Sequence, residues 1–104
     1  MMKFVAVTAC TSGVAHTFMA AEALEKAARE KGYEIKVETQ GTLGIENRIN
    51  ADEVREADAV ILTNDIPIRE RDRFNGKKVF NVSATACIKA SPKIFEALVK
   101  QLGK

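Results

Sequence analysis

The sequence predicts an α/β fold in which a parallel sheet carries helices on both faces. Short apolar runs rich in β-branched residues alternate with segments of helical periodicity, an alternation typical of parallel strands joined by right-handed crossovers. Turn-forming residues such as Gly32, Asn75 and Gly76 separate the segments. The chain has 104 residues and contains no internal repeat or linker. We therefore expect residues 1–104 to form a single three-layer domain.

Four segments have the composition of strands. Residues 3–9 and 57–63 are nearly continuous apolar runs, as expected for strands buried on both faces. Residues 33–39 alternate in polarity, and residues 77–82 are the fourth predicted strand. A four-stranded parallel sheet brings the carboxyl ends of all these strands to one edge, where sites form in such folds. The residues expected at this edge are Cys10, Gln40, Asn64, Asp65 and residues 83–87.

Two helices are predicted in the first half of the chain. Residues 16–31 repeat apolar and small side chains at spacings of three and four, and Gly32 ends the pattern. Asn50 begins a short second helix because Glu53, three residues later, completes a capping box.

Two further helices are predicted after residue 63. The charged segment 66–74 is expected to form a short helix before the Asn75 and Gly76 turn. Ser91 and Pro92 fit the N-cap and first helical position of the last helix. Its expected inner face consists of Phe95, Leu98, Val99 and Leu102.

Composition and charge restrict the class of protein. The chain is 46% hydrophobic and 29% charged, which is typical of globular domains. Its net charge of +2 is too even to predict a nucleic-acid partner. Apolar stretches are too short for a bilayer span, and the N-terminus does not resemble a signal peptide, so we expect a cytoplasmic protein. Two cysteines make no disulfide framework, and one histidine leaves no His-pair metal site, so we expect neither metal nor cofactor.

The segment from Cys10 to Thr17 carries the predicted chemistry. It joins a buried strand to a helix start, where backbone N–H groups and the helix dipole favour an anion. The same field lowers the pKa of a thiol from its free value of about 8.5. These features predict a Rossmann-like fold with a phosphate-binding loop after its first strand, and Cys10 as a nucleophile for a phosphoryl group. The expected phosphoryl-binding residues are Thr11, Ser12, Gly13, Val14, Ala15, His16 and Thr17.

Several of these residues have structural alternatives. Cys10 could be a small buried residue at a strand end, and His16 could be a solvated first-turn side chain rather than a phosphoryl donor. Cys87 fits a structural role better than a catalytic one. A basic cluster is expected to form a solvated face, with docking of an acidic partner as its alternative use. The cluster consists of Arg69, Arg71, Arg73, Lys77 and Lys78.

The spacing of Cys10, His16 and Thr17 is similar to the Cys-x5-Arg-Ser/Thr loop of low-molecular-weight tyrosine phosphatases. Such phosphatases use the arginine to hold transition-state charge and an aspartic acid to protonate the leaving group. This loop has no arginine, and nothing in the sequence links Asp65 to Cys10. A small cysteine-dependent phosphatase or arsenate-reductase-like enzyme is therefore the alternative function, and a non-catalytic anion-binding module is the third.

Residues 5–10 and 13–22 together resemble the phosphorylation-site signature of the fructose-type IIB component of the bacterial phosphoenolpyruvate-dependent sugar phosphotransferase system. Residues 37–41, 57–62 and 73–77 fit the same family in the same order. The family usually has proline after the cysteine, and this chain has Thr11 there.

This resemblance implies a phosphohistidine–sugar phosphotransferase that works without a cofactor or metal. Cys10 would accept a phosphoryl group from a phosphohistidine of a IIA partner and pass it to fructose or a fructose-like sugar. The sugar would enter through a membrane-embedded IIC permease, which would recruit this chain to the membrane surface. Phe18 and Met19 are expected to pack in the helix core, with docking to IIC as the alternative.

Overall fold

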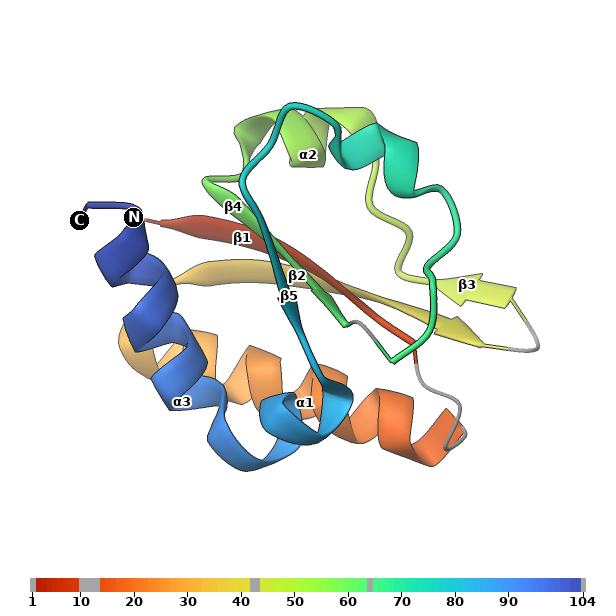
Figure 1. The fold of residues 1–104 in the computed structure, drawn as a ribbon, viewed down its shortest axis with the longest axis horizontal. Helices are drawn as coiled ribbons and strands as arrows, with labels where there is room; N and C mark the ends of the chain where they lie inside the picture. Colours follow the sequence, from red (N-terminus) through yellow and green to blue (C-terminus); the bar gives the residue numbers. More distant parts are fainter. Residues whose placement is uncertain (1, 10–13, 42–43, 64, 104) are drawn as a thin grey trace.

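The computed structural model describes residues 2–9, 14–41, 44–63 and 65–103, and its central feature is a five-stranded sheet (Figure 1). The strand order is β3-β2-β1-β4-β5. Neighbouring strands are parallel except for β3, which pairs antiparallel with β2. The strands are β1 (Lys3–Thr8), β2 (Glu34–Gly41), β3 (Gly44–Glu46), β4 (Ala59–Thr63) and β5 (Val79–Val82).

The predicted four-stranded parallel sheet is confirmed, and β3 is an addition that the sequence analysis missed. Three residues are too few to show a polarity pattern. The predicted third strand corresponds to β4 but starts two residues too early. Ala57 is the C-cap of the preceding helix, where its N–H donates to the carbonyl of Val54, so the strand begins only after it.

Helices cover both faces of the sheet, which confirms the predicted three layers (Figure 1). The helices are α1 (Val14–Lys31), α2 (Ala51–Glu56), the 3₁₀ helix η1 (Arg71–Phe74) and α3 (Ala84–Gln101). In β1, Phe4 and Ala6 lie in the core beneath α1 and α3. Val5 and Val7 point to the opposite face and join the core formed with α2 and η1. The continuous apolar run of β1 therefore serves two separate cores.

The predicted capping box at the start of α2 is confirmed. The Asn50 side chain accepts from the N–H of Glu53 at 2.8 Å, and the Glu53 carboxylate accepts from the N–H of Asn50 at 2.9 Å. The predicted helix within residues 66–74 is reduced to the single 3₁₀ turn of η1.

The last helix begins eight residues earlier than predicted. Its N-cap is Ser83 rather than Ser91, so α3 starts at Ala84 rather than at Pro92. The helix is interrupted at Ala90, whose φ of −145° and ψ of 30° are not helical. Pro92 explains this break, because its ring displaces the carbonyl four residues earlier and it has no N–H to donate. Ser91 and Pro92 therefore mark where the helix resumes.

Candidate functional site

The predicted nucleophile and part of its loop lie outside the residues that the structure describes. This applies to Cys10, Thr11, Ser12, Gly13 and Asn64. The described part of the site consists of the segments that enter and leave this loop and of the neighbouring strand ends.

The carboxyl ends of the parallel strands meet at one edge, as predicted. The register pairs Thr8 of β1 with Thr39 of β2, and Val7 of β1 with Leu62 of β4. The chain therefore leaves β1 between the ends of two neighbouring strands. The first turn of α1 lies at the same edge (Figure 1).

Two buried threonine hydroxyls fix the backbone on either side of the predicted phosphate loop. The hydroxyl of Thr63, at the end of β4, accepts from the N–H of Ala9 at 2.9 Å and donates to its carbonyl at 3.0 Å. The hydroxyl of Thr8 donates to the carbonyl of Thr17 in the first turn of α1 at 3.2 Å. The strand exit and the helix start are thus joined to each other and to β4. Sequence analysis missed Thr63, whose only signal was a hydroxyl at the end of an apolar run.

Replacing Thr63 with valine is expected to lower the free energy of unfolding by about 1–3 kcal/mol. Valine matches threonine in shape but leaves the buried N–H and carbonyl of Ala9 without their shared partner. The matched control is Thr63→Ser, which keeps the hydroxyl and loses only a methyl group. Urea unfolding of both variants tests this, and equal destabilisation of the two would show that the hydroxyl is not the important group.

The described residues at the start of α1 differ in exposure. Ala15 is exposed, His16 is half-buried, and Thr17 is buried. The first turn of α1 contains no acidic side chain, so the positive end of this 18-residue helix is not neutralised from within the helix. A long helix whose first turn lacks acidic side chains favours an anion in front of it.

Phe18 and Met19 do not pack in the core, so that expectation was wrong. Their exposed fractions are 41% and 50%. Phe18 contributes to a groove of about 140 Å³ that also contains Thr17 and Ile45. Two adjacent apolar side chains are therefore exposed within one turn of the predicted loop.

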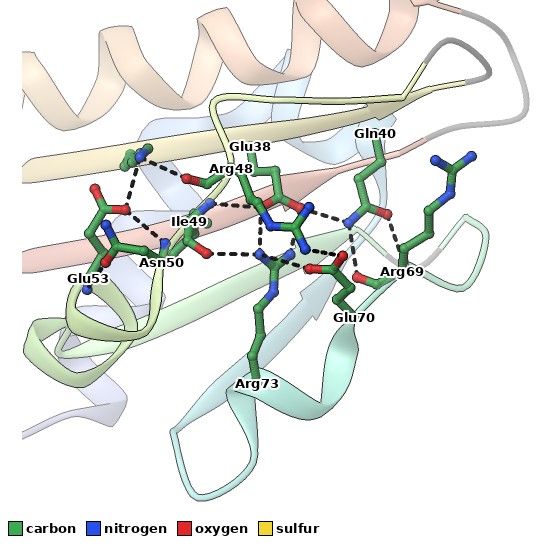
Figure 2. A network of polar contacts seen from close by, with 10 residues as sticks. Glu38, Gln40, Arg48, Ile49, Asn50, Glu53, Arg69, Glu70 and Arg73 are labelled. Atoms are coloured by element: carbon green, nitrogen blue, oxygen red, sulfur yellow. Dashed lines mark hydrogen bonds and ion pairs between the residues drawn. The ribbon is translucent and has the colours of Figure 1, made fainter.

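A fully buried carboxylate, Glu38, lies at the centre of a polar network on the α2 face of the sheet (Figure 2). It accepts from both terminal nitrogens of Arg73 at 2.7 and 2.5 Å and from the backbone N–H of Ile49 at 2.9 Å. The side-chain amide of Gln40 donates to it at 2.8 Å. Burial alone would raise the pKa of Glu38, but these hydrogen bonds and the charge of Arg73 together hold that pKa below its usual value.

Arg73 is therefore not part of a solvated basic face, which corrects the expectation for the basic cluster at this position. Arg71 and Lys78 are exposed, as that expectation stated. Sequence analysis did not predict the pairing of Glu38 with Arg73, which are 35 residues apart.

Gln40, predicted at the edge, is buried and holds the segment that follows β4. Its amide oxygen accepts from the N–H of Arg69 at 2.7 Å, and its amide nitrogen donates to the carbonyl of Arg69 at 3.0 Å. The guanidinium of Arg69 donates to the carbonyl of Gly41 at 3.1 Å. Gln40 thus links the end of β2 to the segment that follows β4 (Figure 2).

Asp65, the other candidate edge residue, is exposed and lies just after β4. Its carboxylate accepts from the N–H of Ala84 at 2.8 Å, in the first turn of α3. This contact therefore favours a structural role for Asp65 over that of the general acid needed by a phosphatase.

Cys87 is a core residue of α3. Its thiol is fully buried. Burial, together with the negative charge of Asp65, raises the pKa of the Cys87 thiol to about 12. A thiol with this pKa stays protonated at neutral pH and does not act as a nucleophile.

Among the described residues, no cluster of three or more His, Cys, Asp or Glu side chains has an arrangement that would hold a metal ion. None of the helices in the described part of the chain combines the length and apolar character that a membrane span requires.

Comparison with known proteins supports one family. Residues 5–97 match the family model described as "PTS system, Lactose/Cellobiose specific IIB subunit". The chain is 51% identical over its whole length to "PTS system fructose-like EIIB component 2" of Escherichia coli K12, covering 98% of that protein. It is 46% identical over 99 residues to "PTS system fructose-specific EIIABC component" of Bacillus subtilis 168, covering 15% of that protein.

Solved structures agree with these relatives. A crystal structure titled as a predicted fructose-specific IIB from Escherichia coli has a TM-score of 0.91 and 40% identity, with 100% of this chain and 92% of that chain covered. A domain of a fructose-specific IIABC component from Borrelia burgdorferi has a TM-score of 0.85 and 47% identity, with 91% and 90% covered.

Proposed function

The chain belongs to the IIB subunits of the sugar phosphotransferase system (PTS), and on this premise we propose that it carries a phosphoryl group on Cys10 for uptake of fructose or a fructose-like sugar. The observation that carries the proposal is the pair of threonine contacts that fix the exit of β1 and the first turn of α1. They hold the two ends of the Cys10 segment at the carboxyl edge, in front of a helix N-terminus without acidic side chains.

In the first proposed step, the Cys10 thiolate attacks the phosphorus of a phosphohistidine on a IIA partner. The sulfur–phosphorus bond forms as the phosphorus–nitrogen bond breaks, and the electron pair of the broken bond remains on the imidazole nitrogen. Backbone N–H groups from Thr11 to Thr17 and the positive end of α1 would stabilise the charge on the transferring oxygens. His16, half-buried in this turn, would add a further donor.

In the second proposed step, a sugar hydroxyl attacks the phosphocysteine. The oxygen–phosphorus bond forms, the sulfur–phosphorus bond breaks, and the thiolate of Cys10 is regenerated. The hydroxyl proton passes to the medium. Both steps transfer the phosphoryl group from a good leaving group, so neither needs an aspartic acid at the position of Asp65.

Fused relatives support the proposed partners. The chain is similar to one segment of the fructose-specific EIIABC component of Bacillus subtilis and of the fructose-like EIIBC component of Escherichia coli. We therefore propose a IIA protein as the phosphoryl donor and a membrane IIC permease as the site of sugar delivery. The exposed side chains of Phe18 and Met19 support docking of such partners over the loop. This arrangement assigns the chain to the cytoplasmic side of the membrane.

The test is intact-mass analysis of the full chain after incubation with phosphoenolpyruvate, the general PTS proteins and a fructose-class IIA. We expect one phosphoryl adduct, which peptide mapping under mildly alkaline conditions assigns to Cys10. Absence of an adduct when the IIA itself is phosphorylated, both in the chain and in its Thr11→Pro variant, would overturn the proposal. Turnover of an aryl phosphate without an adduct would favour the phosphatase alternative instead.

A further inference from the structure

We propose that Arg69 is a further phosphoryl-binding residue of this site and that Gln40 is the positioning residue that holds it there. The inference rests on the proposed transfer to Cys10. It adds a cation from outside the Cys10–Thr17 segment, which itself contains no arginine or lysine.

The backbone of Arg69 is fixed by a buried side chain. Gln40, only 5% exposed, exchanges two hydrogen bonds with the N–H and the carbonyl of Arg69, at 2.7 and 3.0 Å. The same amide nitrogen donates to the carboxylate of Glu38 at 2.8 Å. This third contact fixes which end of the Gln40 amide donates and which accepts. Two hydrogen bonds thus hold the backbone of Arg69 against Gln40 (Figure 2).

Arg69 differs from the other two arginines in this network in the partner of its guanidinium group. Arg48 forms an ion pair with Glu70, and Arg73 forms one with Glu38. The guanidinium of Arg69 donates to a backbone carbonyl, that of Gly41, and within the described segments no carboxylate lies within ion-pair distance of it. Arg69 is also exposed. Its positive charge is therefore available to a ligand.

Its position brings this charge to the edge where transfer is proposed. Gly41 ends β2, and the neighbouring strand β1 ends at Thr8, which pairs with Thr39. Cys10 follows Thr8 by two residues in the sequence. The end of β2 therefore lies beside the end of β1, from which the chain continues to Cys10.

A guanidinium suits this role chemically. A phosphoryl group carries negative charge on three oxygens, and the planar fork of an arginine binds two of them at once. The Arg69 hydrogen bond to Gly41 uses one of five N–H donors, which leaves an edge free for the phosphoryl oxygens. The guanidinium keeps its proton throughout, so it changes no bond and acts by electrostatic stabilisation alone.

The test compares single-turnover phosphorylation of wild type, Arg69→Ala, Arg69→Lys and Arg71→Ala over a range of phospho-IIA concentrations. Arg71 is the matched control, because it is exposed in the same segment and its removal changes the net charge equally. We expect Arg69→Ala to lower the rate at saturating IIA by about 100-fold, the effect typical of losing one transition-state donor. Arg69→Lys should lower this rate by a smaller factor, and Arg71→Ala should have the wild-type rate.

A second measurement needs no partner. Inorganic phosphate should protect Cys10 from alkylation by iodoacetamide in wild type and in Arg71→Ala, and protect it much less in Arg69→Ala. Equal protection in all three would overturn the proposal. The proposal would also be overturned if Arg69→Ala reached the wild-type rate at saturation but needed a higher phospho-IIA concentration to reach half of it. Arg69 would then be a docking residue instead. If wild type accepts no phosphoryl group at all, the proposed function fails, and the phosphate protection still tests Arg69 by itself.

Discussion

Replacing Cys10 with serine is expected to abolish phosphoryl acceptance while the fold persists. A serine hydroxyl is not ionised at neutral pH, whereas a thiol in front of a helix N-terminus is readily converted to the nucleophilic thiolate. The expected result is no phosphoryl adduct by intact mass in the presence of a phosphorylated IIA. The change is nearly isosteric, so thermal unfolding should remain cooperative and close to wild type.

Cys87→Ala provides the matched control for this prediction. It removes the chain's other thiol, which is buried in the core and has a raised pKa. The variant should still accept the phosphoryl group, although it should be less stable because it leaves a small cavity. Acceptance by Cys10→Ser at the wild-type level, or its loss in a folded Cys87→Ala, would contradict the assignment of Cys10 as the nucleophile.

The sequence predicted those parts of the fold that depend on local patterns. The apolar run of β1 and the capping box of Asn50 and Glu53 are encoded within a few residues, and both are confirmed. The start of α3 was missed because Pro92 is a valid first residue of a helix and also a valid interruption of a longer one. Local sequence does not separate these two cases, whereas the N-cap at Ser83 does so in the structure.

In the candidate site, too, local sequence predicted some features and not others. Strand polarity alone placed Gln40 and Asp65 at one edge of the sheet. Their partners, however, depend on how distant segments are aligned. The contact of Thr63 with Ala9 follows from the β1–β4 register, and that of Gln40 with Arg69 from the path of the chain after β4. Neither is encoded near the residue itself, so only the folded chain shows them.

Replacing Arg73 with methionine is expected to lower the free energy of unfolding by about 3–5 kcal/mol, because it leaves the charge of a buried carboxylate without its partner. Glu38 is fully buried, and Arg73 supplies two of its four hydrogen bonds. The matched control is Arg48→Met, which breaks an exposed ion pair with Glu70 and should cost less than about 1 kcal/mol. Urea unfolding at neutral pH measures both, and equal costs would contradict this account of the Arg73 pair.

The pH dependence provides a second check on the Glu38 and Arg73 pair. Because the folded chain lowers the pKa of Glu38 below its ordinary value of 4.5, the pair stabilises the fold above that pH. This contribution is lost as pH falls through the lowered folded-state pKa. In the Arg73→Met variant the carboxylate of Glu38 has no counter-charge. Acidification neutralises Glu38 in both proteins, so it should reduce the difference in free energy of unfolding between wild type and variant.

A double variant, Glu38→Met with Arg73→Met, should recover much of the stability that Arg73→Met loses, because a buried ion pair replaced by apolar side chains is often tolerated. Recovery in the double variant would show that the single variant is destabilised by an uncompensated charge rather than by lost packing.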